Sequence, residues 1–238
     1  MKNYAKLSAL GAVLVMTAAF ASADTIAIVS NFATTTYTGY NPDPTNSTPT
    51  NNAPTGTSNL NNVTPSWAHE GPNSSWVSWD PNSGPSGGET AGSCTALPCT
   101  TYDADGTYTY KFTFTTNGGP GDVYGGFIGV LADDTADVIL NGTTILMPEG
   151  VIGGDGHCSD NVPSCMTPDF FFLGSSLPGF NNNGVNTLTF VVEQTGTIYQ
   201  GLDFFGSITS TPEPNSLVLL GTGLIGSAGA LFRKMRRA

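Results

Sequence analysis

Three groups of residues in the sequence have types and spacings that could do chemistry. The first is a set of three tryptophans within 13 residues, Trp67, Trp76 and Trp79. Flat indole faces stack on sugar rings, so these residues are candidates for carbohydrate binding. Large aromatic side chains are also mostly buried, and core packing is therefore the competing interpretation.

The second group is acidic. Asp133, Asp134 and Asp137 offer carboxylate oxygens, which are the ligands that Ca²⁺ prefers. Their spacing matches no known calcium loop, so the alternative is a solvated turn whose carboxylates accept hydrogen bonds from nearby backbone N–H groups. We expect no other cofactor.

The third group consists of four cysteines in two close pairs, Cys94 with Cys99 and Cys158 with Cys165. Residues that are close in the sequence meet most often, so we expect disulfides between neighbours, although four cysteines allow three connectivities. A zinc site that includes His157 is the alternative. The spacings of four and six residues between the cysteines differ from the two of zinc ribbons.

Motifs of common catalytic sites are missing from the sequence. Neither histidine, His69 or His157, falls in a His-Glu-x-x-His pattern, and there is no Gly-x-Ser-x-Gly or phosphate-binding loop. A glycoside hydrolase needs two carboxylates, but nothing in the sequence singles out a pair. We therefore expect a protein that is not an enzyme, and a secreted hydrolase is the least favoured alternative.

The C-terminal segment, residues 211–238, combines three features in a fixed order. These are Pro212, Glu213 and Pro214, then an uncharged apolar run of 16 residues from Leu217 to Phe232, then the basic residues Arg233, Lys234, Arg236 and Arg237. A membrane-spanning helix needs roughly 17–25 residues, so the run predicts a short transmembrane helix over 217–232. Basic flanks stay in the cytoplasm, which places the body of the protein on the other side of the membrane.

This tail resembles the PEP-CTERM sorting signal of bacterial envelope proteins, which is also called the ice-binding protein C-terminal domain. The resemblance implies processing by an exosortase, a membrane-embedded transpeptidase that cuts near the Pro-Glu-Pro and releases or re-anchors the body. It also implies a cell that makes exopolysaccharide. An ordinary membrane anchor is the alternative, but such an anchor has no use for Pro-Glu-Pro.

The N-terminal segment predicts export. Residues 1–23 contain Lys2 and Lys6, an apolar stretch from Leu7 to Phe20, and Ala21-Ser22-Ala23. A basic region, an apolar region and a small-residue cleavage site in this order are typical of a signal peptide. Residues 24–210 are then left as one folded domain.

That domain is strongly acidic. It holds 17 of the 18 acidic residues, all except Glu213, and Lys111 is its one basic residue, which gives a net charge of −16. Nucleic acids and anionic lipids bind through lysine and arginine, so the composition argues against both as partners of the body. An acidic surface does keep a protein soluble.

Short runs of β-branched and aromatic residues between turn residues predict an all-β sandwich. The best strand is 106–115, where aromatic and polar residues alternate, and 124–132 reads as a strand buried on both faces. Asn141-Gly142 predicts a hairpin turn. A Thr/Asn/Pro-rich loop is expected at about 31–65. Trp76 and Trp79 should point to opposite faces, one of them exposed.

The order of these segments resembles the galactose-binding-like jelly roll of many carbohydrate-binding modules. The resemblance is carried by 106–114, 126–132, the acidic turn that leads to Asn141-Gly142, 184–190 and 201–204. It implies a fold and no particular binding residue. We thus expect an exported, non-enzymatic envelope or matrix protein that associates with exopolysaccharide. It would be membrane-anchored before processing and afterwards at the cell surface or in the matrix, with a carbohydrate-binding module as the alternative.

Overall fold

The computed structural model describes most of the body and little of the two ends. The described residues are 23–42, 57–60, 63, 66–81, 83–85, 103, 105–119, 121–146, 163–196 and 199–211, with six separate residues at 222, 223, 225, 226, 229 and 233. The chain divides into two units, Thr25–Ser210 and the two termini, Met1–Asp24 with Thr211–Ala238.

Several predicted features fall outside the described residues. These are the signal peptide up to residue 22, the Pro212-Glu213-Pro214 motif, and most of both the apolar run and the basic cluster. In the part of the chain that the structure describes, no helix has both the length and the apolar character needed to cross a membrane. The helix over 217–232 therefore stays a prediction.

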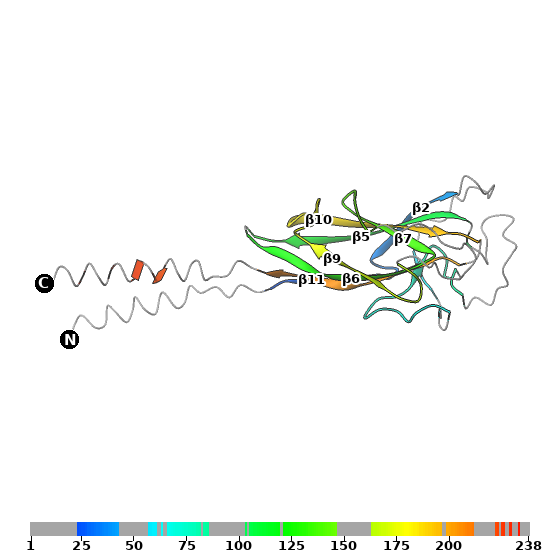
Figure 1. Cartoon of the computed structure of the whole chain (residues 1–238), viewed down its shortest axis with the longest axis horizontal. Helices are drawn as coiled ribbons and strands as arrows, with labels where there is room; N and C mark the ends of the chain where they lie inside the picture. Colours follow the sequence, from blue (N-terminus) through cyan, green and yellow to red (C-terminus); the bar gives the residue numbers. More distant parts are fainter. Residues whose placement is uncertain are drawn as a thin grey trace. The chain divides into compact units, whose positions relative to one another are not determined.

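Two facing antiparallel sheets form the body (Figure 1), which confirms an all-β, sandwich-like fold. The strands are β1 Thr25–Val29, β2 Thr35–Pro42, β3 Ser58–Asn59, β4 Val77–Ser78, β5 Gly106–Asn117, β6 Val123–Asp133, β7 Thr135–Leu140, β8 Thr143–Leu146, β9 Asp169–Gly174, β10 Asn183–Gln194 and β11 Gly201–Thr211. The first sheet has the order β3-β4-β11-β6-β9, with β1 also paired to β11. The second sheet has the order β2-β5-β10-β7-β8.

The second sheet is built around β5 and β10, which pair in register from Gly106↔Gln194 to Asn117↔Asn183. Alternation decides which side chains face the core, because successive residues of a strand point to opposite faces. The inward side chains of β5 are the aromatic ones of the predicted alternation, Tyr108, Tyr110, Phe112 and Phe114, and those of β10 are Leu188, Phe190 and Val192. Lys111, between two of them, is exposed.

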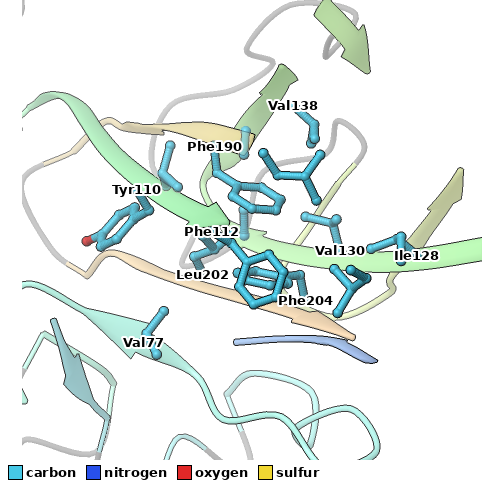
Figure 2. Close-up of a cluster of buried hydrophobic side chains, with 14 of the residues drawn as sticks. Val77, Tyr110, Phe112, Ile128, Val130, Val138, Phe190, Leu202 and Phe204 are labelled. Carbon is cyan, nitrogen blue, oxygen red and sulfur yellow. The ribbon is translucent and has the colours of Figure 1, made fainter. Parts of the chain in front are cut away.

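Aromatic rings from both sheets meet in the main core. Phe190 of β10 stacks on Phe204 of β11, with ring centroids 4.5 Å apart and an interplanar angle of 14°. Phe112 of β5 meets the same Phe204 ring edge-on at 5.4 Å. Figure 2 shows these three rings in the space between the sheets. Burial of large apolar side chains and these favourable ring geometries together hold the layers to each other.

The Asn141-Gly142 hairpin is confirmed. Asn141 has φ 47° and Gly142 has φ 86°, the pair of positive values that a type I′ turn requires. The turn is also tied to β10, since the Asn141 side-chain oxygen accepts a hydrogen bond from the Thr187 N–H at 2.8 Å. The Asn141 amide donates to the buried Asn186 Oδ1 at 3.0 Å.

The predicted loop at about 31–65 is partly wrong, because it contains β2 and β3. β2 pairs with β5 along the edge of the second sheet. Its Tyr37 is buried, and its ring lies 5.4 Å from the ring of Tyr110. The segment Thr35–Tyr40 carries three threonines and two tyrosines, a β-favouring composition that the flanking Asn and Pro residues conceal. Residues 43–56 lie outside the described residues.

The prediction for 124–132 is correct for only half of β6. From Ile128 to Asp133 every residue is buried, so that half is covered on both faces. Phe127, by contrast, is 65% exposed. Among the described residues, the small cluster that covers the outer face of the first sheet includes Leu131 of β6 and does not include Phe127.

Candidate functional site

The three tryptophans are all buried. Trp67 and Trp76 pack against each other, with ring centroids 4.5 Å apart, in the small cluster on the outer face of the first sheet. Trp79 lies in the main core. Trp76 and Trp79 thus belong to opposite faces, as predicted, but the expectation that one is exposed is wrong. The covering cluster contains Leu60 and Val63, which come from the preceding segment.

Trp79 leads to a buried carboxyl group that sequence reasoning did not single out. Its indole N–H donates to Asp103 Oδ1 at 2.5 Å, and the Ser83 hydroxyl donates to the same oxygen at 3.1 Å. Burial raises the pKa of Asp103 well above its ordinary value, and the two donated hydrogen bonds oppose that shift. The second oxygen, Oδ2, has no hydrogen-bond partner among the described residues.

Beside Asp103 lies a polar group centred on Gln200. The Gln200 Oε1 atom accepts hydrogen bonds from the Ser78 hydroxyl at 2.7 Å and from the Tyr110 hydroxyl at 2.9 Å. The Gln200 backbone N–H donates to the Ser83 carbonyl at 3.2 Å. Two further polar atoms, Gln200 Nε2 and Tyr37 OH, have no partner within the part of the chain that is described. Burial, and next the charge of Asp103, raise the pKa of Tyr37.

The acidic segment does not form the solvated turn that was the alternative to a calcium site. Asp134 alone separates β6 from β7, and Asp137 lies on β7 opposite Val191 of β10. Asp133 and Asp134 are buried. Burial first, and the neighbouring Asp134 second, raise the pKa of Asp133, both of whose oxygens lack a hydrogen-bond partner among the described residues.

Asp134 links the β6–β7 connection to the residue that follows β10 through hydrogen bonds. Its Oδ2 atom accepts hydrogen bonds from the Thr195 N–H at 2.6 Å and the Thr195 hydroxyl at 2.7 Å, just after β10. Burial raises the pKa of Asp134 despite these bonds. The described residues contain no group of three histidine, cysteine or acidic side chains that is able to hold a metal ion. The structure therefore does not assemble Asp133, Asp134 and Asp137 into a calcium site.

Asp203 is a further buried acid that links separate segments through hydrogen bonds. It accepts a hydrogen bond from the Ser30 hydroxyl at 2.6 Å and another from the Gly71 N–H at 2.8 Å. It thereby joins β11 to the end of β1 and to the loop near Trp76. Burial raises the pKa of Asp203, and the bond from Ser30 opposes the shift. The sequence signal was present, since Asp203 is the one charged residue in an otherwise apolar strand segment.

The remaining candidates are only partly described. Cys165 is buried in the outer cluster with Trp67 and is disulfide-bonded. Cys94, Cys99 and Cys158 lie outside the described residues, as does His157, so the pairing of the cysteines stays a prediction. His69 is exposed.

The buried carboxyl groups hold other parts of the body in position. Asp103 holds Trp79, Asp134 holds Thr195, and Asp203 holds Ser30, each through hydrogen bonds to groups on other segments. A buried acid with a raised pKa retains its proton more easily than an exposed one, and it can then donate or accept a hydrogen bond. These three buried carboxyl groups are thus suited to fixing loops onto the sandwich.

Comparison with known families identifies the tail. Residues 210–237 match the PEP-CTERM protein-sorting motif, which confirms the resemblance seen in Pro212-Glu213-Pro214 and the basic cluster. The comparison with curated proteins gives no match. The motif begins at Ser210, and β11 ends at Thr211, so the sorting segment follows directly from the last strand of the body. This motif implies a protein that is exported, sorted to the surface and processed by an exosortase.

Proposed function

We propose that this chain is a non-enzymatic protein of the cell envelope or extracellular matrix that associates with exopolysaccharide after an exosortase has processed its tail. The observation that carries the proposal is the match of residues 210–237 to the sorting motif. The signal peptide at 1–23, the transmembrane helix at 217–232 and the membrane-anchored precursor belong to the same proposal. Its finer fold is the galactose-binding-like jelly roll.

The boundary between body and tail supports this order of events. The compact unit ends at Ser210, and Thr211, the last residue of β11, is exposed. Pro212 follows at once, and proline cannot extend the strand because it lacks an N–H group. A cut near Pro-Glu-Pro therefore removes the apolar run without removing any strand of the two sheets.

The roles of the buried acids support the absence of catalysis. Catalytic carboxylates must reach a substrate, whereas Asp103, Asp133 and Asp203 are buried and those with partners are bonded to their own body. Their raised pKa values follow from burial, which structural acids share with catalytic ones. The geometry thus favours a structural body over a hydrolase.

The acidic charge of the body is consistent with a location in the cell envelope or the extracellular matrix. With a net charge of −16 between Asp24 and Ser210, the body repels anionic surfaces and stays dispersed among neutral or hydrated polymers. A carbohydrate-binding module with a defined sugar site remains the second candidate. The burial of Trp67, Trp76 and Trp79 counts against it, because stacking on a sugar ring needs an open aromatic face.

The test is intact mass spectrometry of the protein recovered from the cells that make it, together with a binding assay on their exopolysaccharide. We expect a mature chain that starts near Asp24, ends near the Pro-Glu-Pro motif and is retained by the exopolysaccharide. Recovery from the cytosol with both ends intact would contradict the proposal. Binding of one defined oligosaccharide on a glycan array would favour the carbohydrate-binding module, and turnover of a polysaccharide would favour the hydrolase.

A further inference from the structure

An exposed aromatic surface lies on the outer face of the first sheet. Phe127 of β6 is 65% exposed, and Phe170 and Phe172 of β9 are 58% and 36% exposed. We call these three residues the aromatic patch. Single exposed apolar residues are normal on protein surfaces, but a contiguous group of large ones marks an interaction site.

The three rings are contiguous because of the register between the two strands. Phe127 pairs with Phe172 across the ladder, and their rings meet edge-to-face at 6.0 Å. The next outward pair is Gly129 with Phe170. A Cβ atom on Gly129 would approach the Phe170 ring to 2.9 Å, so the glycine makes room for that ring. The same ring contacts Phe205 of β11 at 5.8 Å.

The patch reaches the edge of the sheet. β9 is the last strand of the order β3-β4-β11-β6-β9, and among the described residues its ladder partner is β6 alone. On its other side, β9 has no neighbouring strand within the part of the chain that the structure describes, so its backbone N–H and C=O groups form an edge there. Exposed edges attract further strands, and proteins usually protect them with lysine, an inner proline or a bulge. β9, with the sequence DFFFLG, has none of these.

We propose that β9 is a self-association edge, at which a second copy of this chain adds its own β9 in antiparallel orientation about Phe171. The first sheets of two copies then form one continuous sheet across a twofold axis. Such an interface is isologous, because each copy uses the same surface. Phe170 of each copy lies opposite the partner subunit's Phe172, so the two aromatic patches merge into one apolar surface.

The side chains of β9 are self-complementary in this register. Asp169, its one charged residue, lies opposite the partner subunit's Leu173. The two Asp169 carboxylates are then separated by four residues along the strands, which is about 13 Å at roughly 3.3 Å per residue. That distance exceeds the Debye length of about 8 Å at physiological ionic strength, so their repulsion is largely screened. Cross-strand aromatic pairs add to the backbone hydrogen bonds.

The rest of the body limits the strength of the association. Two copies of a body with net charge −16 repel each other, and a six-residue edge is short. We therefore expect a weak dimer that forms in the micromolar range and strengthens as salt is added. A contact dominated by opposite charges would instead weaken with salt.

Sedimentation velocity of the processed protein, purified from the cells that make it, tests the proposal over a concentration series. We expect a monomer–dimer equilibrium in the wild type. Phe170→Lys and Phe172→Lys each place a charge on the edge and should weaken dimerisation by roughly tenfold or more. The matched control is Phe32→Lys, since Phe32 is similarly exposed, at 63%, but lies in the turn after β1.

A charge-exchange experiment tests the register. In the proposed pairing, position 170 of one copy faces position 172 of the other. The double variant Phe170→Lys with Phe172→Glu should therefore regain dimerisation, because each new lysine faces a new glutamate of the partner. A monomeric wild type at every concentration would overturn the proposal. So would dimers that persist in both single lysine variants, or failure of the charge-exchanged pair to recover while its unfolding midpoint matches the wild type.

Discussion

At the scale of single residues, Asp103 shows how burial and charge oppose each other in this body. Its Oδ1 atom is needed as an acceptor for Trp79 and Ser83, yet its Oδ2 atom has no partner among the described residues. The ionised form gains the two hydrogen bonds, and burial favours the neutral form. Because burial is the larger effect, the pKa is raised. Asp103 therefore stabilises the fold most when it is protonated.

This balance gives a prediction for the pH dependence of stability. The unfolded chain titrates Asp103 near its ordinary pKa of 3.8, whereas the folded protein titrates it at a higher pH. The stability from the protonated carboxyl is thus complete below about pH 4 and is lost as the pH rises through the folded-state pKa, at up to about 1.4 kcal/mol per pH unit. Asp103→Asn keeps an acceptor oxygen and no charge, so its free energy of unfolding should fall less steeply between pH 4 and pH 8.

Urea unfolding at a series of pH values measures that slope. The control is Asp103→Ala, which removes the charge and also the acceptor for Trp79 and Ser83. It should be less stable than Asp103→Asn at every pH, because two buried donors lose their partner. Equal slopes in the wild type and Asp103→Asn would show that the carboxyl is not protonated in the folded body.

What the sequence predicts at this scale depends on whether the cause is local. Alternation placed Tyr110 and Phe112 in the core correctly, since a strand's own geometry decides which way they point. It could not show that Trp76 is covered, because the covering residues Leu60 and Val63 reach it only through the fold. Asp103 sits in a polar stretch with no local signal of burial.

At the scale of elements, β5 was the most predictable strand, whereas the sequence of β9 hides its alternation. β5 alternates aromatic and polar residues along most of its length, and a long periodic pattern is hard to produce by chance. β9 has three consecutive phenylalanines, which conceal the alternation between the exposed Phe170 and Phe172 and the inward Phe171. Its place at an edge depends on strand order, which local sequence does not encode.

The β7–β8 turn gives a prediction in which backbone conformation acts alone. Gly142 has φ +86°, and a Cβ atom built there meets nothing within 4 Å. Gly142→Ala should therefore cost only the penalty of a left-handed L-residue, about 1–2 kcal/mol of the free energy of unfolding. Gly39→Ala is the matched control, since a Cβ atom there also meets nothing and the glycine lacks a positive φ.

Thermal or urea unfolding of the two alanine variants measures the difference. Gly39→Ala should lie close to the wild type, within about 0.5 kcal/mol. If both variants lose the same stability, the turn does not require the left-handed conformation at position 142. Because Asn141 also bonds to Asn186 and Thr187, the hairpin should persist in Gly142→Ala, at a lower stability.

At the scale of the whole molecule, charge separates the ends from the body. Six of the seven basic residues lie in the first 23 and the last 28 residues, and 17 of the 18 acidic residues lie between them. The order of features within each terminal segment predicted export and sorting, and the match of residues 210–237 to the sorting motif supports that prediction. The strand order of the body could not be predicted from the sequence, because the sheets join segments far apart in the chain, such as β1 with β11 and β2 with β5.

Because the basic residues lie in the terminal segments, removal of the tail changes the charge of the protein measurably. Replacement of Pro212, Glu213 and Pro214 by alanine removes the motif's signature but leaves β11, which ends at Thr211, intact. We expect the variant to keep its apolar run and basic cluster, and so to move from the matrix to the membrane fraction. Since loss of the basic cluster removes four positive charges, the wild-type product should have a lower isoelectric point than the variant, which isoelectric focusing measures.

The control is Ser207→Ala, an exposed change on β11 outside the motif, which should be processed normally. Release of both variants at the wild-type rate would show that cleavage does not depend on Pro-Glu-Pro.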